Sequence, residues 1–135
     1  MWECPICKRK FKVTNQSHIC TTKTVGELFV DAPDAFVLAY DDIIQEVQQW
    51  EPCYVGASTK AVVVTSTIAW LIIRPMKTRL DVKFYTAQPV ESERVRQVRP
   101  FNNKFGNHIH IRYPEQVDEE LFELLRIGFD YSIQT

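Results

Sequence analysis

The sequence has little glycine and no large excess of charge of one sign, and each shortage excludes a class of protein. Only 4 of the 135 residues are glycine, and neither a Walker-type nor a dinucleotide-binding glycine motif occurs. No serine elbow or cysteine–histidine nucleophile signature is present either. The net charge of -1 argues against strong nonspecific binding to polyanions.

The sequence also lacks a segment that suits a membrane. The longest strongly apolar run, Ile68 to Ile73, is far too short to span a bilayer. The N-terminus is charged within its first ten residues and has no apolar signal core. Together with cysteines in metal-like spacing, these features predict a cytoplasmic protein with no membrane partner. The hydrophobic content of 45% is typical of one compact domain with a small appendage.

The appendage is predicted from four metal-binding side chains near the start of the chain. Cys4, Cys7, His18 and Cys20 form a Cys-x2-Cys-x10-His-x-Cys array, and zinc takes four such ligands in tetrahedral geometry. Because residues 1–23 are too few to bury a core, a bound ion would order them. Four protein ligands close the site, so we predict a structural zinc in a small hairpin. Buried thiols or a disulfide are the alternative.

The charges of the chain are strongly segregated. Residues 1–23 carry five bases and one acid, whereas residues 24–59 carry seven acids and no base. Residues 60–112 carry ten bases and three acids, and residues 113–135 carry six acids and one base. If the acidic segments are helices and the basic segment is a sheet, one face of the domain is positive.

The spacing of apolar residues predicts helices and a sheet in the main domain, residues 24–135. Thr24 opens a capping box for a short helix, Phe36 to Trp50 repeats at helical spacing, and Asp118 is placed to cap a last helix. Strand-like patterns cover residues 60–65, 67–73, 79–85 and 108–112, with a weaker one at 95–98. We therefore expect an α+β fold in which an antiparallel sheet of about four strands carries helices on one face.

The polar face of the predicted sheet holds the candidate ligand residues. His108 and His110 are two residues apart on a strand, so both rings would face one side and could bind a metal or act as acid and base. An ordinary solvated strand face is the simpler interpretation. Asp81 and Lys83 form half of a metal-dependent nuclease signature, but the second acid is missing. The predicted anion-binding patch consists of Lys60, Arg79, Lys83, His108, His110 and Arg112.

Several short motifs of the main domain occur together in a known family. They are Ser58-x-Lys60, Ile68-Ala69-Trp70, Arg74-Pro75, Asn107-His108 and Pro114-Glu115-x-Val117-Asp118-x-Glu120-Leu121. In these motifs the chain resembles a bacterial family, domain of unknown function 5655 (DUF5655), some members of which share the N-terminal Cys-Cys-His-Cys motif. The family has no established reaction, so the resemblance implies a fold and no activity. Some members are joined to nuclease-like domains, which favours nucleic acid by analogy.

The leading hypothesis is a small zinc-stabilised binding module, and an enzyme is the less favoured interpretation. Its basic sheet face would bind nucleic acid, another anionic ligand or a protein partner, and interleaved Arg, Lys, Tyr and Trp suit a single strand. One alternative is a hydrolase-like enzyme using His108 with Lys60 and Arg112. A deep pocket around His108 would favour this alternative. A second alternative is a protein–protein interaction module without a ligand. The oligomeric state is not predicted.

Overall fold

A computed structural model describes residues 2–6, 8, 10–11, 14–15 and 24–134 of the chain. Its main feature is one antiparallel sheet with the strand order β3-β4-β5-β6-β8-β7. The strands are β3 (Tyr54–Ala57), β4 (Val62–Thr65), β5 (Ala69–Pro75), β6 (Leu80–Thr86), β7 (Val95–Phe101) and β8 (Lys104–Ile111). The helices are α1 (Val25–Leu28), α2 (Asp34–Val47), the 3-10 turn η1 (Pro114–Gln116) and α3 (Glu119–Ile133).

The helix starts follow from local capping. The Thr24 hydroxyl accepts the Glu27 N–H at 3.2 Å, and the Asp118 carboxylate accepts the Leu121 N–H at 3.0 Å. Such caps satisfy backbone donors that have no partner within the helix. At α2 the capping position is Pro33, without a side-chain bond, and Asp34 is the first helical residue.

The prediction of about four strands was wrong, because the sheet has six. β3 is short and contains a glycine, so its pattern is weak. β7 and β8 form a hairpin across Asn102 and Asn103, which take positive φ angles of 46° and 68°. Asparagine tolerates this left-handed backbone, and a two-residue turn of this kind suits the twist of a hairpin. Residues 100–106, for which the sequence predicted no strand, therefore form the tip of two paired strands.

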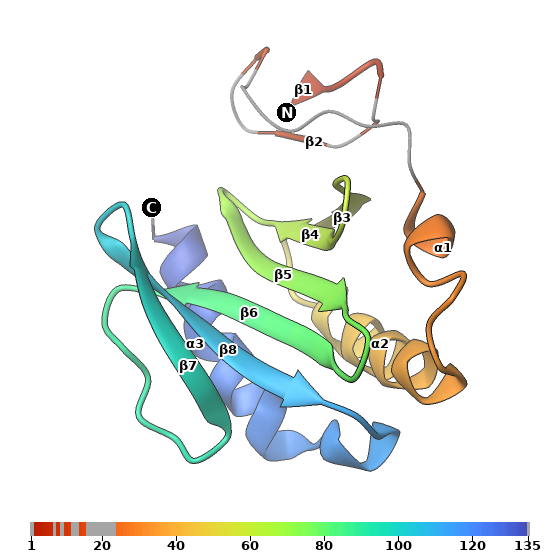
Figure 1. Ribbon diagram of the computed structural model, residues 1–135. Coiled ribbons are helices and arrows are strands. Elements are labelled where there is room, and N and C mark those ends of the chain that lie inside the picture. Colours follow the sequence, from red (N-terminus) through yellow and green to blue (C-terminus); the bar gives the residue numbers. More distant parts are fainter. Residues whose placement is uncertain (1, 7, 9, 12–13, 16–23, 135) are drawn as a thin grey trace.

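Both long helices cover the same face of the sheet. In Figure 1, α2 and α3 lie behind the strands, while the other face of β6, β7 and β8 is turned toward the viewer. α3 comes close because Gly128 has no side chain, and a Cβ there would lie 3.2 Å from Trp70 and from Phe84. The Trp70 ring is fully buried, and its centroid is 5.7 Å from that of Phe129. These contacts form the core between helices and sheet.

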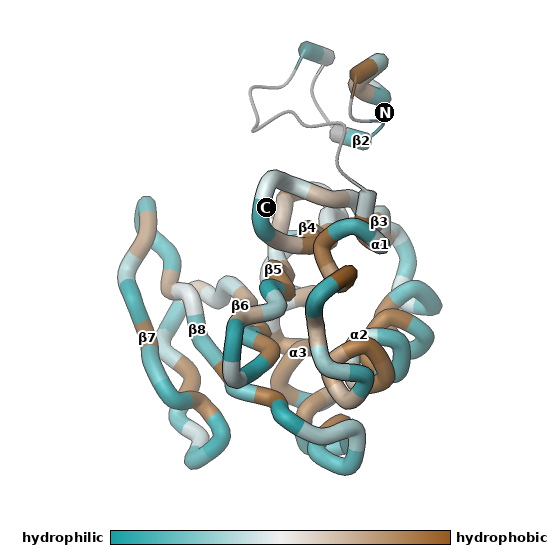
Figure 2. The backbone as a smooth tube through the Cα atoms, turned by 45° about the vertical axis from the view of Figure 1, so that its right-hand side comes forward, coloured by the Kyte–Doolittle hydropathy of each residue, from teal (hydrophilic) through white to brown (hydrophobic). Residues whose placement is uncertain are grey.

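The strand β7 lies at one edge of the sheet and is mostly hydrophilic (Figure 2). Its residues after Val95 are exposed and include Arg96, Arg99 and Pro100. Charged residues and proline on an edge strand discourage pairing with another chain. Within the described part of the chain, no helix is long and apolar enough to cross a membrane.

Near the N-terminus, β1 (Trp2–Glu3) and β2 (Lys10–Phe11) form a separate antiparallel pair. The Lys8 N–H donates to the Cys4 carbonyl at 2.9 Å, and Lys8 has a positive φ of 65°. The chain thus turns back directly after Cys4.

One buried amide ties the loop before β7 to the sheet. Asn107 is fully buried, accepts the Val90 N–H at 3.0 Å, and donates to the Phe84 carbonyl at 3.1 Å. It also donates to the Thr86 hydroxyl at 2.8 Å. A buried donor or acceptor that loses its partner costs about 1–3 kcal/mol.

We predict that Asn107→Leu lowers the free energy of unfolding by about 2–3 kcal/mol, because several buried polar groups lose their partners. Urea denaturation followed by circular dichroism measures this change. Gln88→Leu, at an exposed position of the same loop, is the control and should change the stability little. Equal stability of both variants would contradict the assigned role of Asn107.

Candidate anion-binding face

The face of the sheet that the helices leave open carries most of the candidate residues. Lys83 of β6 pairs with His108 of β8, and Asp81 pairs with His110. Their neighbours along β6, including Val82, are fully buried in the core. Because side chains alternate along a strand, these four residues point away from the helices.

Two imidazoles share one carboxylate on this face. The Nδ1 atom of His108 lies 3.0 and 3.1 Å from the two Asp81 carboxylate oxygens, and the Nε2 atom of His110 lies 3.7 Å from one of them. The three side chains are partly covered, with exposed fractions of 17%, 14% and 27% for His108, Asp81 and His110. Asp81 therefore fixes the His108 ring and lies close to the His110 ring as well.

The pKa of His110 is lowered from its usual value of 6.5. Burial is the largest cause, and the positive charge of Arg79 is the next. Arg96 and His108 lower this pKa further, and Asp81 opposes the shift. The imidazole of His110 is therefore neutral at pH 7, although it lies beside a carboxylate.

Four arginines lie on or directly beside the strands around this pair of histidines. Arg74 of β5 pairs with Asp81, Arg96 lies at an irregularity of β7, and Arg79 and Arg112 directly precede β6 and follow β8. Among the residues that the structure describes, none of these guanidinium groups has an ion pair, and the buried Nε of Arg79 has no acceptor. We call this the arginine–histidine cluster: Arg74, Arg79, Arg96, Arg112, His108 and His110 around Asp81.

A second cluster lies toward the β7–β8 turn. The Lys104 ammonium is 4.2 Å from the centroid of the Tyr85 ring, and the Lys83 ammonium is 5.2 Å from it. The Phe101 ring is 5.9 Å from Tyr85 and 52% exposed. Burial, together with the charge of Lys83, lowers the pKa of Lys104. We call this the lysine–aromatic cluster: Lys83, Tyr85, Phe101 and Lys104.

Gly106 makes this second cluster compact. It stands opposite Tyr85 in the sheet, and a Cβ at Gly106 would lie 3.2 Å from the Lys83 side chain. The absence of a side chain lets the Lys83 stem lie flat across β8. Two groups of cations thus occupy one open face, with aromatic rings among the lysines.

One family model matches most of the chain. The model of a family described as "Domain of unknown function (DUF5655)" matches residues 25–132. The chain belongs to the DUF5655 family. No curated protein and no solved structure matches the chain. The matched residues run from the start of α1 to Ser132 in α3, and the description of the family assigns no reaction.

The DUF5655 domain does not bring all predicted site residues together. Lys60 precedes β4, and strands β5 and β6 lie between β4 and β8. Lys60 is therefore separated from His108 and Arg112 by the width of two strands. Sequence reasoning missed Arg74, Arg96, Lys104, Tyr85 and Phe101, three of which belong to the unpredicted β7–β8 hairpin.

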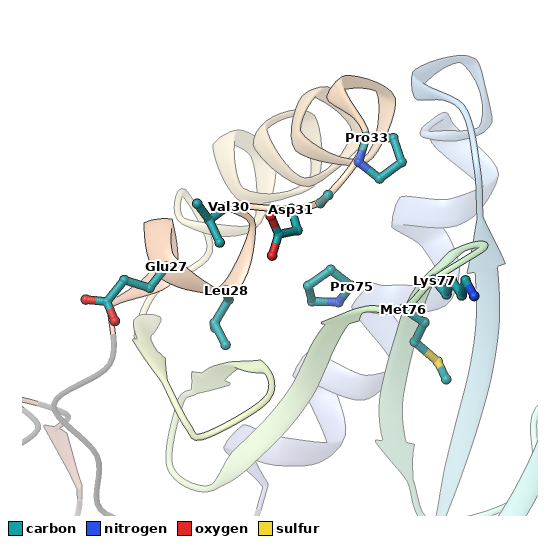
Figure 3. A pocket seen from close by; sticks show the side chains of 9 residues that line it. Glu27, Leu28, Val30, Asp31, Pro33, Pro75, Met76 and Lys77 are labelled. Atoms are coloured by element: carbon teal, nitrogen blue, oxygen red, sulfur yellow. The ribbon is translucent and has the colours of Figure 1, made fainter.

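Two surface cavities formed by the described residues of the DUF5655 domain lie elsewhere. One of about 440 Å³ separates α1 from the β5–β6 turn, with Glu27 and Asp31 on one side and Pro75 and Met76 on the other (Figure 3). Its acids do not suit an anion. A second, of about 570 Å³, lies between α2 and α3 and is also mainly acidic. His108 lines neither of these two cavities.

The predicted zinc array falls largely outside the described residues. Cys4 is buried in the turn after β1, whereas Cys7, His18 and Cys20 lie outside the part of the chain that the structure describes. Within that part, no three His, Cys, Asp or Glu side chains are grouped to hold a metal ion. The same finding gives no support to a metal between His108, His110 and Asp81.

We predict that Arg79→Gln raises the pKa of His110, because the positive charge that lowers this pKa most is removed. The measurement is a pH titration of the imidazole proton signals by nuclear magnetic resonance. Arg126→Gln is the matched control, since Arg126 belongs to α3 on the covered side of the sheet. An unchanged His110 pKa in Arg79→Gln would show that the two side chains do not interact.

Proposed function

We propose that this DUF5655 protein is a binding module for single-stranded nucleic acid, which contacts the open face of the sheet. The observation that carries the proposal is the grouping of lysines and arginines beside the buried Tyr85 ring and the exposed Phe101 ring. Among the described residues, these cations have no ion pair. Phosphates are held by Lys and Arg, and bases stack on aromatic side chains with little sequence preference. The lysine–aromatic cluster combines both kinds of contact in one place.

The same cluster favours a single strand over a duplex. The Phe101 ring is 52% exposed and lies beside the Lys104 ammonium, at 5.6 Å. A base can stack on such a ring only when its own face is free, which a duplex does not allow. The net charge of -1 would make the binding depend on this face, since the molecule as a whole is not basic.

We further propose that Cys4, Cys7, His18 and Cys20 hold a structural zinc ion. The turn after Cys4 supports this proposal, because it folds the chain back within the first ligand pair. The ion would order a segment that also adds charge to the domain, since the Lys10 ammonium is 5.5 Å from the centroid of the Tyr54 ring. A reducing compartment such as the cytoplasm would keep these thiols available.

The hydrolase alternative has less support. It needed Lys60 beside His108, and the order of the strands separates them. A zinc ion with four protein ligands offers no open position for a water molecule. Partner binding without a nucleic acid stays the second candidate, and the binding experiment below distinguishes the two.

For the zinc proposal, we expect one zinc ion per chain in protein purified without added metal. Cys4→Ser should lower the zinc content, as measured by elemental analysis, because one of four ligands is lost. Cys53→Ser is the control: burial raises the pKa of the Cys53 thiol to about 11, so it stays protonated and should not bind the ion. A wild-type protein free of zinc would refute the proposal.

For nucleic acid, we expect Lys104→Gln to weaken binding of a single-stranded oligonucleotide and to reduce the salt slope of the affinity by about one. Phe101→Ala should weaken binding with an unchanged salt slope, because it removes stacking and no charge. Lys60→Gln removes the same charge outside the clusters and serves as the control. Fluorescence anisotropy at several salt concentrations measures all four proteins. Equal affinities of all four proteins would show that the lysine–aromatic cluster does not bind the oligonucleotide.

A further inference from the structure

We propose that the arginine–histidine cluster binds the terminal phosphate of a nucleic acid strand. This inference rests on the proposed function and names the part of the ligand that this end of the face takes. The first observation is that the buried Nε of Arg79 has no hydrogen-bond acceptor among the residues that the structure describes. Buried donors without partners are rare in folded proteins, and a bound anion is one way to satisfy them.

The charge of the cluster suits a phosphomonoester better than an internal phosphodiester. Four arginines lie on or directly beside the strands β5 to β8, whereas Asp81 is the one acid of the cluster and is already hydrogen bonded to His108. A terminal phosphate carries a charge of about -1.5 to -2 at pH 7 and three strong acceptor oxygens, whereas an internal phosphate carries about -1. Arginine forks bind such an oxygen array with two parallel hydrogen bonds.

The position of the arginine–histidine cluster suits the end of a bound nucleic acid strand. Lys104 opens β8 beside the aromatic rings, and His110 lies near the other end of the same strand. Six residues of extended chain span about 20 Å, which leaves room for several nucleotides between the two clusters. Arg79 and Arg112 stand just beyond the strands β6 and β8, at the rim of the sheet.

His110 provides a direct reporter of the bound phosphate. Its surroundings are Arg79 and Arg96, which lower its pKa, Asp81, which raises it, and His108 beside it on β8. A phosphate among these groups would offset the arginine charges and favour the protonated imidazole. The pKa of His110 should therefore rise when the site is filled.

The test compares three oligonucleotides of one sequence, with a 5′-phosphate, a 3′-phosphate or neither, by fluorescence anisotropy at constant salt. One phosphorylated form should bind about tenfold more tightly than the unphosphorylated form. Arg79→Gln and His110→Gln should abolish this difference, so that each variant binds the phosphorylated and unphosphorylated strands with equal affinity. Lys104→Gln should weaken all three ligands by the same factor, and Arg126→Gln should weaken none.

Two outcomes separate this inference from the proposed function. If all three oligonucleotides bind equally, the terminal-phosphate site is refuted while binding of the strand stands. If no oligonucleotide binds, the proposed function fails. Titration with inorganic phosphate then shows whether the arginine–histidine cluster binds an anion at all. A rise in the His110 pKa that Arg79→Gln removes would support an anion site, and an unchanged pKa would refute it.

Discussion

The packing of α3 against β5 and β6 determines which face of this sheet is closed. Gly128 lets the helix approach the strands, and the rings of Trp70 and Phe129 meet in the space between them. α2 completes the same layer, so the apolar side chains of every central strand turn toward the helices. Alternation along the strands then sends their other side chains to the open face. Any function of the sheet in recognition must use that open face.

This fold determines where the acidic and basic segments of the chain lie on the surface. The acidic segments form the two long helices, and most of the basic segment forms the strands. Because the inward positions of the strands are apolar, nearly all their cations gather on the open face. One arginine of this segment, Arg94, instead forms an ion pair with Asp118 at the start of α3. A molecule of almost neutral net charge therefore presents one positive side, whose local field governs binding at short range.

Local signals predicted much of this fold, and nonlocal pairing explains what they missed. The caps at Thr24 and Asp118 and the alternation around β6 follow from neighbouring residues, and the structure contains all of them. The β7–β8 hairpin was missed because the turn at Asn102 and Asn103 carries no glycine. Lys60 was wrongly predicted to lie beside His108, because no local sequence pattern determines the order of the strands in the sheet. The zinc array stays a prediction, since three of its four ligands lie outside the described residues.

The most direct test of the account is a map of where a single-stranded oligonucleotide touches the isotopically labelled protein, obtained from chemical-shift changes by nuclear magnetic resonance. We predict that the changes concentrate on β6, β7 and β8, with Lys83, Gly106 and His110 among the most affected residues. The amides of α2 and the outer side of α3 should change little. Changes centred on the helices, or none at ligand concentrations that saturate other single-strand binders, would contradict the central claim.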